Sequence, residues 1–73
     1  LDAVRRCDNA FPDADATRVT RLGPDVRKDY AGWWFCVRPS GTEPRLLRVT
    51  VEARDRAVAD DALARLRAII EEG

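Results

Sequence analysis

Apolar side chains near the start of the chain recur at spacings of three and four residues, at Leu1, Val4, Cys7 and Phe11. Such spacing puts one apolar stripe along a helix, and a proline disfavours helical geometry in the residue before it. We therefore predict a first helix that ends before Pro12. The stretch 12–15 that follows is typical of a turn.

Four extended segments follow this helix, at residues 17–22, 26–30, 33–38 and 46–53. The first is rich in β-branched residues, and the second and third flank Ala31-Gly32, which suits a hairpin turn. In the fourth, apolar and polar residues alternate, which is typical of a strand with one packed face. The alternation also predicts that Trp33 and Trp34 lie on opposite faces of the sheet.

A second apolar stripe predicts a long C-terminal helix, with Val58, Ala62, Leu63, Leu66, Ile69 and Ile70 on its buried side. Asp55 is the expected N-cap, and Gly73 is a suitable stop. The element order is α-β-β-β-β-α. It predicts an α+β fold, in which a four-stranded antiparallel sheet carries both helices on one face.

The composition of the chain excludes several classes of partner and site. A chain of 73 residues (1–73) suits one small domain. Its 13 basic and 13 acidic residues give no net charge, so we expect no nucleic-acid partner and no membrane partner. No run approaches the ~20 apolar residues of a membrane span and no signal-peptide pattern is present, which favours the cytoplasm. We expect Cys7 and Cys36 to be reduced core residues, and without histidine we expect no metal site.

The segment 38–45 between the last two strands, Arg-Pro-Ser-Gly-Thr-Glu-Pro-Arg, carries the chemistry. Gly41 allows close approach of a ligand to the backbone, Ser40 and Thr42 offer hydroxyl donors, and the prolines stiffen the flanks. Arg38 and Arg48 share one strand face, so their guanidinium groups are expected to converge on an anion. These features predict a phosphate-binding loop.

The run 37–44 (Val-Arg-Pro-Ser-Gly-Thr-Glu-Pro), followed by 48–53 (Arg-Val-Thr-Val-Glu-Ala), resembles the signature loop and strand of the α-D-phosphohexomutases, the phosphoglucomutase/phosphomannomutase family. In that family the loop belongs to the fourth, C-terminal domain, which has a fold like that of the TATA-box-binding protein. The resemblance extends along essentially the whole chain. It implies that residues 1–73 are the C-terminal domain of a larger phosphohexomutase.

The resemblance also implies a role for each site residue. The phosphate group of the substrate that is not transferred would bind to Arg38, Ser40, Gly41, Thr42 and Arg48. Arg45 is the alternative second arginine, because one extra residue separates Arg48 from the loop. Members of this family are isomerases. They move a phosphate group between positions 1 and 6 of glucose or mannose phosphates through a bisphosphorylated sugar. The resemblance implies that a phosphoserine and Mg²⁺ take part in this reaction, both on other domains of the larger parent enzyme.

The family's Ser-His-Asn and Asp-Gly-Asp motifs are missing from residues 1–73, so we expect no catalytic residue and no metal ligand in this chain. Two alternatives stay open. A four-stranded sheet with aromatic and arginine side chains is also found in RNA-binding domains, although the aromatic-rich signature strand is missing here. A protein-interaction domain is the other alternative, and loss of ligand response in a folded Arg38→Ala variant would exclude it.

Overall fold

The computed structural model describes residues 2–39 and 46–72. Along the chain the elements are α1 (Asp2–Ala10), a short 3-10 helix η1 (Asp13–Asp15), β1 (Arg18–Leu22), β2 (Asp25–Tyr30), β3 (Trp33–Pro39), β4 (Leu47–Ala53) and α2 (Arg56–Glu72). This order confirms the predicted α-β-β-β-β-α arrangement, and each predicted helix and strand begins and ends close to the predicted residues.

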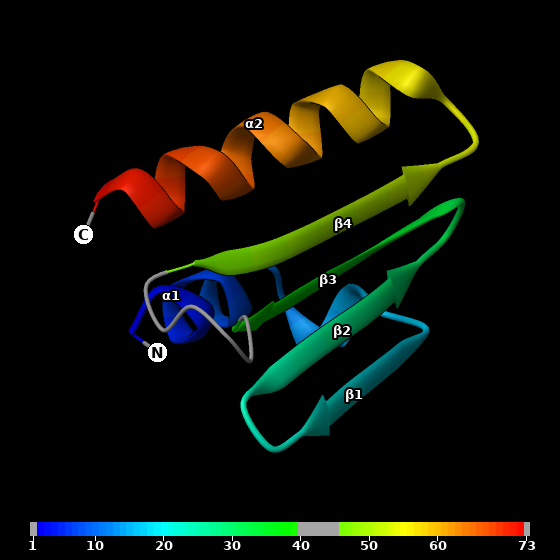
Figure 1. Ribbon diagram of the computed structural model, residues 1–73. Helices are drawn as coiled ribbons and strands as arrows, with labels where there is room; N and C mark the ends of the chain where they lie inside the picture. Colours follow the sequence, from blue (N-terminus) through cyan, green and yellow to red (C-terminus); the bar gives the residue numbers. More distant parts are fainter. Residues whose placement is uncertain (1, 40–45, 73) are drawn as a thin grey trace.

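The four strands form one antiparallel sheet in the order β1-β2-β3-β4, so that neighbours in sequence are neighbours in space (Figure 1). Tight turns join the first three strands. Gly23 and Gly32 take φ values of +59° and +82° in these turns, a region that L-residues with a Cβ rarely adopt. The β2–β3 hairpin predicted from Ala31-Gly32 is therefore confirmed.

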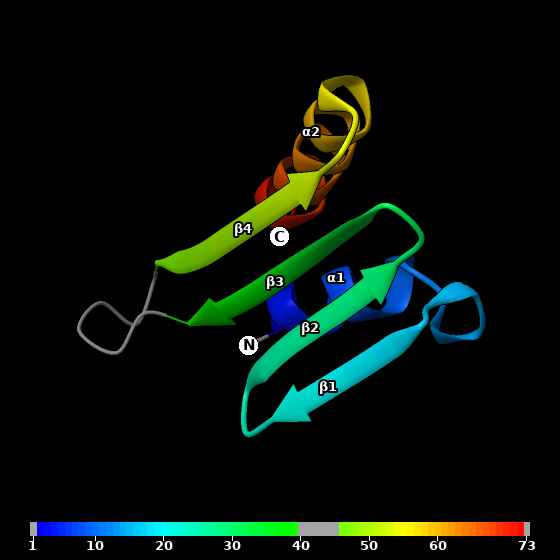
Figure 2. The ribbon, with the colours of Figure 1, turned by 90° about the vertical axis from the view of Figure 1, so that its right-hand side faces the viewer.

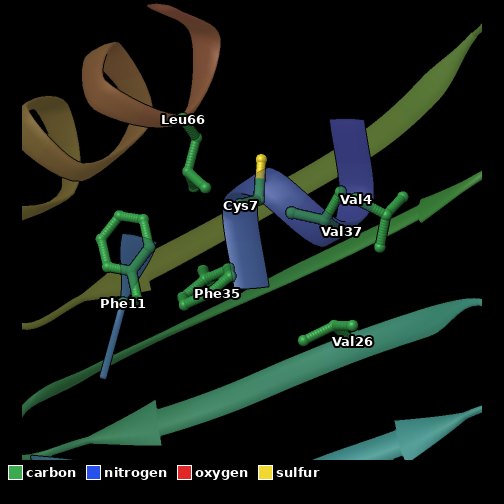
Figure 3. Packing of buried hydrophobic residues seen from close by; sticks show 7 residues of the cluster. All are labelled: Val4, Cys7, Phe11, Val26, Phe35, Val37 and Leu66. Carbon is green, nitrogen blue, oxygen red and sulfur yellow. The ribbon is translucent and has the colours of Figure 1, made fainter. Parts of the chain in front are cut away.

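Both helices pack on the same face of the sheet, with α2 running alongside β4 and α1 lying behind β2 and β3 (Figure 2). The core between the layers consists of apolar side chains from β2, β3, α2, α1 and the residue directly after α1 (Figure 3). They are Val4, Cys7, Phe11, Val26, Phe35, Val37 and Leu66. Strand alternation directs the remaining side chains of β3 and β4 to the other face, which no described helix covers and which we call the open face.

Three predicted core positions turn out to be less buried than expected. Val58 and Leu63 of α2 are 38% and 37% exposed, because the helix contacts the sheet mainly through Ala62 and Leu66. Cys36 is a free thiol as predicted, but it lies half-buried on the open face because its strand parity is opposite to that of Phe35. Cys7 is a buried free thiol, as predicted.

The start of α2 follows the predicted capping pattern. The Asp55 carboxylate Oδ1 accepts a hydrogen bond from the backbone N–H of Ala57 at 2.9 Å, which satisfies one of the amide groups that a helix leaves without a partner at its beginning. Gly73, the predicted stop, lies outside the described residues.

A buried cation joins α1 to the sheet. Lys28 of β2 points toward the helices and is only 1% exposed. Its ammonium donates to the backbone carbonyl oxygens of Asp8 (2.6 Å) and Phe11, and it lies 2.7 Å from carboxylate oxygens of Asp8 and Asp13. Arg21 of β1 donates to the same two carboxylates at 2.8 Å. We call these four side chains the Lys28 cluster.

Candidate functional site

The two predicted phosphate-binding arginines lie directly opposite each other on adjacent strands. Arg38 near the end of β3 pairs in register with Arg48 near the start of β4, and both side chains are exposed on the open face. Within residues 2–39 and 46–72, no ion pair neutralises either guanidinium. Because like charges in directly opposed positions destabilise a sheet, this pair favours an anion between the two side chains.

A shallow pocket of about 390 Å³ surrounds this arginine pair. Its lining comes from the open face of β2, β3 and β4 and consists of Arg27, Trp34, Cys36, Arg38, Arg48 and Thr50. We call it the arginine pocket. Three guanidinium groups, one hydroxyl and one thiol give it many donors, and no carboxylate belongs to the lining, so the pocket suits an oxyanion.

Arg27, which the sequence reasoning did not single out, makes two contacts within this region. Its guanidinium carbon lies 3.9 Å from the centroid of the Trp34 ring, and its Nη2 donates to Asp29 Oδ1 at 2.9 Å. The hydrogen bond to the Asp29 carboxylate is the main reason that the pKa of Arg27 lies above its ordinary value. Arg27 is therefore charged at neutral pH, as arginine ordinarily is.

A second hollow of about 400 Å³ lies at the opposite end of β3, beside the β2–β3 turn. Asp29 and Glu52 line it together with Trp34, whereas Arg54 is its one basic lining residue. Two carboxylates repel an anion, so this hollow does not offer an alternative phosphate site.

The remaining predicted site residues, Ser40, Gly41 and Thr42, lie outside the described residues, as does Arg45. The structure thus brings Arg38 and Arg48 together, as their strand parity predicted. It places Arg27 and Thr50 in the same pocket. The position of Arg27 in the pocket follows from the register between β2 and β3, which no local sequence pattern predicts.

Lys28 is the most buried charged side chain among the described residues, but its surroundings indicate a structural role. Burial alone lowers the pKa of a lysine, yet the Asp13 and Asp8 carboxylates outweigh this effect and raise the pKa of Lys28 above its ordinary value. A protonated amine with four oxygen neighbours is not a nucleophile. The Lys28 cluster therefore serves the fold.

Groups of three or more potential metal ligands are absent from the part of the chain that the structure describes. Mg²⁺ prefers several oxygen ligands, at least one or two of them carboxylates, so the described residues do not fit a Mg²⁺ site of their own. Neither described helix is long and apolar enough to cross a bilayer.

Comparison with known proteins identifies similar sequences. Residues 3–69 match the family model "Phosphoglucomutase/phosphomannomutase, C-terminal domain". A "Probable phosphoglucosamine mutase" of Pyrococcus furiosus is 36% identical over 64% of this chain, and one of Methanocella arvoryzae is 39% identical over 63%. A "Phosphoglucosamine/phosphogalactosamine mutase" of Sulfurisphaera tokodaii is 44% identical over 63%.

In each case the matched segment covers only 9–10% of the relative's own length. The chain thus matches only a small part of these much longer proteins. No solved structure matches the chain significantly.

Proposed function

Because this chain belongs to the phosphoglucomutase/phosphomannomutase C-terminal domain family, we propose that it binds the phosphate group of a hexose phosphate. The residues that we assign to phosphate are Arg38, Ser40, Gly41, Thr42 and Arg48. The observation that carries this proposal is the cross-strand pairing of Arg38 with Arg48 at the rim of the arginine pocket. Arg48 lines this pocket, and we propose it as the second arginine; Arg45, the alternative, lies outside the described residues.

The energetics of such a site are adequate for a weak, specific contact. A hydrogen bond between a guanidinium and a phosphate oxygen contributes roughly 1.5–3 kcal/mol. Two such arginines and the donors of the loop therefore hold a phosphate at useful strength within a complete cleft. Alone, one wall of a cleft supplies only part of the affinity, and we expect a dissociation constant of ~1 mM or weaker for the isolated chain.

For the whole protein we propose the family's reaction, the interconversion of hexose 1-phosphate and hexose 6-phosphate through a bisphosphorylated sugar in the cytoplasm. In this proposal the present chain holds the phosphate that is not transferred and helps to close the active site against water. The phosphoserine and Mg²⁺ belong to other domains of the longer protein, which supply the phosphoryl transfer. This chain's contribution is binding and orientation.

The sugar is the open part of the proposal. The prediction from sequence was glucose or mannose phosphates, and the printed names of the relatives add glucosamine and galactosamine phosphates. We propose glucosamine phosphate as the first substrate to test for the whole protein. Neither the family match nor the relatives favour the RNA-binding or protein-interaction alternative.

The test is an amide-resolved NMR titration with glucose 6-phosphate, mannose 6-phosphate, glucosamine 6-phosphate and unphosphorylated glucose. We expect saturable shifts at Arg38, Gly41 and Arg48 with all three phosphates and none with glucose. Arg38→Ala should abolish these shifts. The matched control is Arg56→Ala, since the Arg56 side chain is 94% exposed on α2, and it should leave them unchanged. Equal shifts with glucose and its phosphate would contradict the proposal.

A further inference from the structure

Arg27 lies between the arginine pair and an aromatic ring on the open face. Its register partner across the β2–β3 ladder is Cys36, so Trp34 and Arg38 are its two diagonal neighbours on β3. Diagonal neighbours in an antiparallel sheet are about 7–8 Å apart, within reach of a long side chain. The Arg27 side chain can therefore extend either toward Trp34 or toward Arg38.

In the structure Arg27 extends toward Trp34. Its guanidinium lies 3.9 Å from the ring centroid and 2.9 Å from the Asp29 carboxylate. The Arg27 side chain is 45% exposed and that of Asp29 22%, so water screens both contacts. Exposed ion pairs and exposed cation–π contacts are weak, whereas guanidinium–phosphate bonds are charge-assisted and often bidentate.

A phosphate between Arg38 and Arg48 would change this balance. A dianionic phosphate monoester presents three strong acceptor oxygens, and each of them accepts more than one hydrogen bond, so it can bind Arg27 in addition to Arg38, Arg48 and the proposed donors of the loop. Arg27 lines the same pocket as both of them, and no carboxylate belongs to that lining. The third arginine would meet an acceptor there in place of the repulsion that it would meet in the ligand-free pocket.

We propose that Arg27 is a third phosphate-binding residue, held on Trp34 and Asp29 in the ligand-free chain and turning toward the anion when phosphate occupies the Arg38/Arg48 pair. This inference rests on the proposed function, because it needs a phosphate at that pair. Asp29 and Trp34 act as the resting partners of the Arg27 guanidinium, and the Asp29 carboxylate balances its charge while no anion is bound. The ligand class is a dianionic phosphate monoester.

The direct test is an NMR titration with inorganic phosphate and, separately, with glucose 6-phosphate at pH 7.5, above the second pKa of a phosphate ester near ~6. The signals to follow are the Arg27 Nε–H, the Trp34 indole N–H and the Arg38 amide. We expect all three to shift with one common midpoint. The indole signal reports the departure of the guanidinium from the ring.

Two substitutions give effects of opposite sign. Arg27→Gln should weaken phosphate binding about fivefold or more, since it removes a charge-assisted contact. Asp29→Asn should strengthen binding about twofold to threefold, since it frees Arg27 from its resting partner. In an Arg27→Gln background the gain from Asp29→Asn should vanish, which a double-mutant cycle detects.

The matched control is Arg18→Gln. Arg18 lies on the same open face, opposite Asp29 in register, and it does not line the arginine pocket. It should weaken binding less than about twofold, as expected for a screened charge at a distance.

Equal weakening by Arg27→Gln and Arg18→Gln, with the Arg38 amide still responding to phosphate, would overturn this inference and leave the proposed function standing. A silent Trp34 indole beside a responding Arg38 amide would do the same. A chain that responds to neither phosphate nor glucose 6-phosphate at any of the three signals would overturn the proposed function together with this inference.

Discussion

Replacing Lys28 with methionine should destabilise the chain, even though the change puts an apolar side chain into a buried position. Lys28 is 1% exposed, and its ammonium satisfies the carbonyl oxygens of Asp8 and Phe11 near the end of α1. That helix has no basic residue of its own in its last turn, so Lys28 supplies the cation that favours a helix C-terminus. Methionine fills the space but donates no hydrogen bond.

The magnitude follows from what each oxygen loses. Each carbonyl loses a charge-assisted hydrogen bond of roughly 1.5–3 kcal/mol, and the two carboxylates lose less because Arg21 still binds both of them. Against this loss, methionine avoids the cost of burying an ammonium, which is several kcal/mol. The net expectation is a destabilisation of about 2 kcal/mol.

Urea unfolding followed by circular dichroism measures this value. With a slope of about 1 kcal/mol/M for a protein of this size, the midpoint should fall by about 2 M. The matched control is Arg27→Met on the neighbouring position of β2, where the side chain is 45% exposed on the open face, and its midpoint should stay close to wild type. A Lys28→Met chain as stable as wild type would refute the reasoning, because desolvation would then outweigh the bonds.

Three further predictions concern stability. The neighbouring Arg21 and Lys28 lower the pKa of Asp8 from 3.8 to about 2, with the Arg21 hydrogen bond as the largest cause. A carboxyl group with a lowered pKa contributes stability that is complete above about pH 5 and lost as the pH falls toward 2, here roughly 2 kcal/mol. Asp8→Asn should therefore flatten the acid side of the curve of unfolding free energy against pH. Leu66→Ala, at a site that is 0% exposed, should cost about 2–5 kcal/mol in thermal unfolding, whereas Leu63→Ala, 37% exposed, should cost under about 1 kcal/mol. Asp55→Ala should cost about 1 kcal/mol and speed amide exchange in the first turn of α2, and Asp55→Asn should restore both; no change in Asp55→Ala would contradict the capping role.

Most of the fold follows from local patterns. The alternation of apolar and polar residues predicted β4, because period-two burial is a property of each strand alone. Ala31-Gly32 between two extended segments predicted the β2–β3 hairpin. The helix stripes were also correct in outline. Val58 and Leu63 belong to the apolar stripe of α2 but stay partly exposed, because periodicity shows which side of a helix is apolar and leaves open how much of that side the sheet covers.

Lys28 shows what sequence patterns cannot reveal. In an alternating strand a lysine is normally assigned to solvent, and its burial here depends on Asp8 and Asp13, which lie 20 and 15 residues earlier in the chain. The contact of Arg27 with Trp34 depends in the same way on the β2–β3 register. In the candidate site, the Arg38/Arg48 convergence was predicted from parity, while the roles of Ser40, Gly41 and Thr42 stay predictions because these residues lie outside the described ranges.

The register of β3 against β4 has a consequence for how this surface can evolve. Arg38 and Arg48 are held opposite each other by a ladder whose other pairs include Val37 with Val49 and Phe35 with Val51, all anchored in the core. The backbone positions of the two arginines are thus set by the register of the sheet. Insertions or exchanges between residues 39 and 46 should therefore leave the register of this pair unchanged. A homologous segment grafted between residues 39 and 46 would therefore receive a preset two-arginine base, which makes this sheet a suitable scaffold for exchanging ligand preference among related proteins.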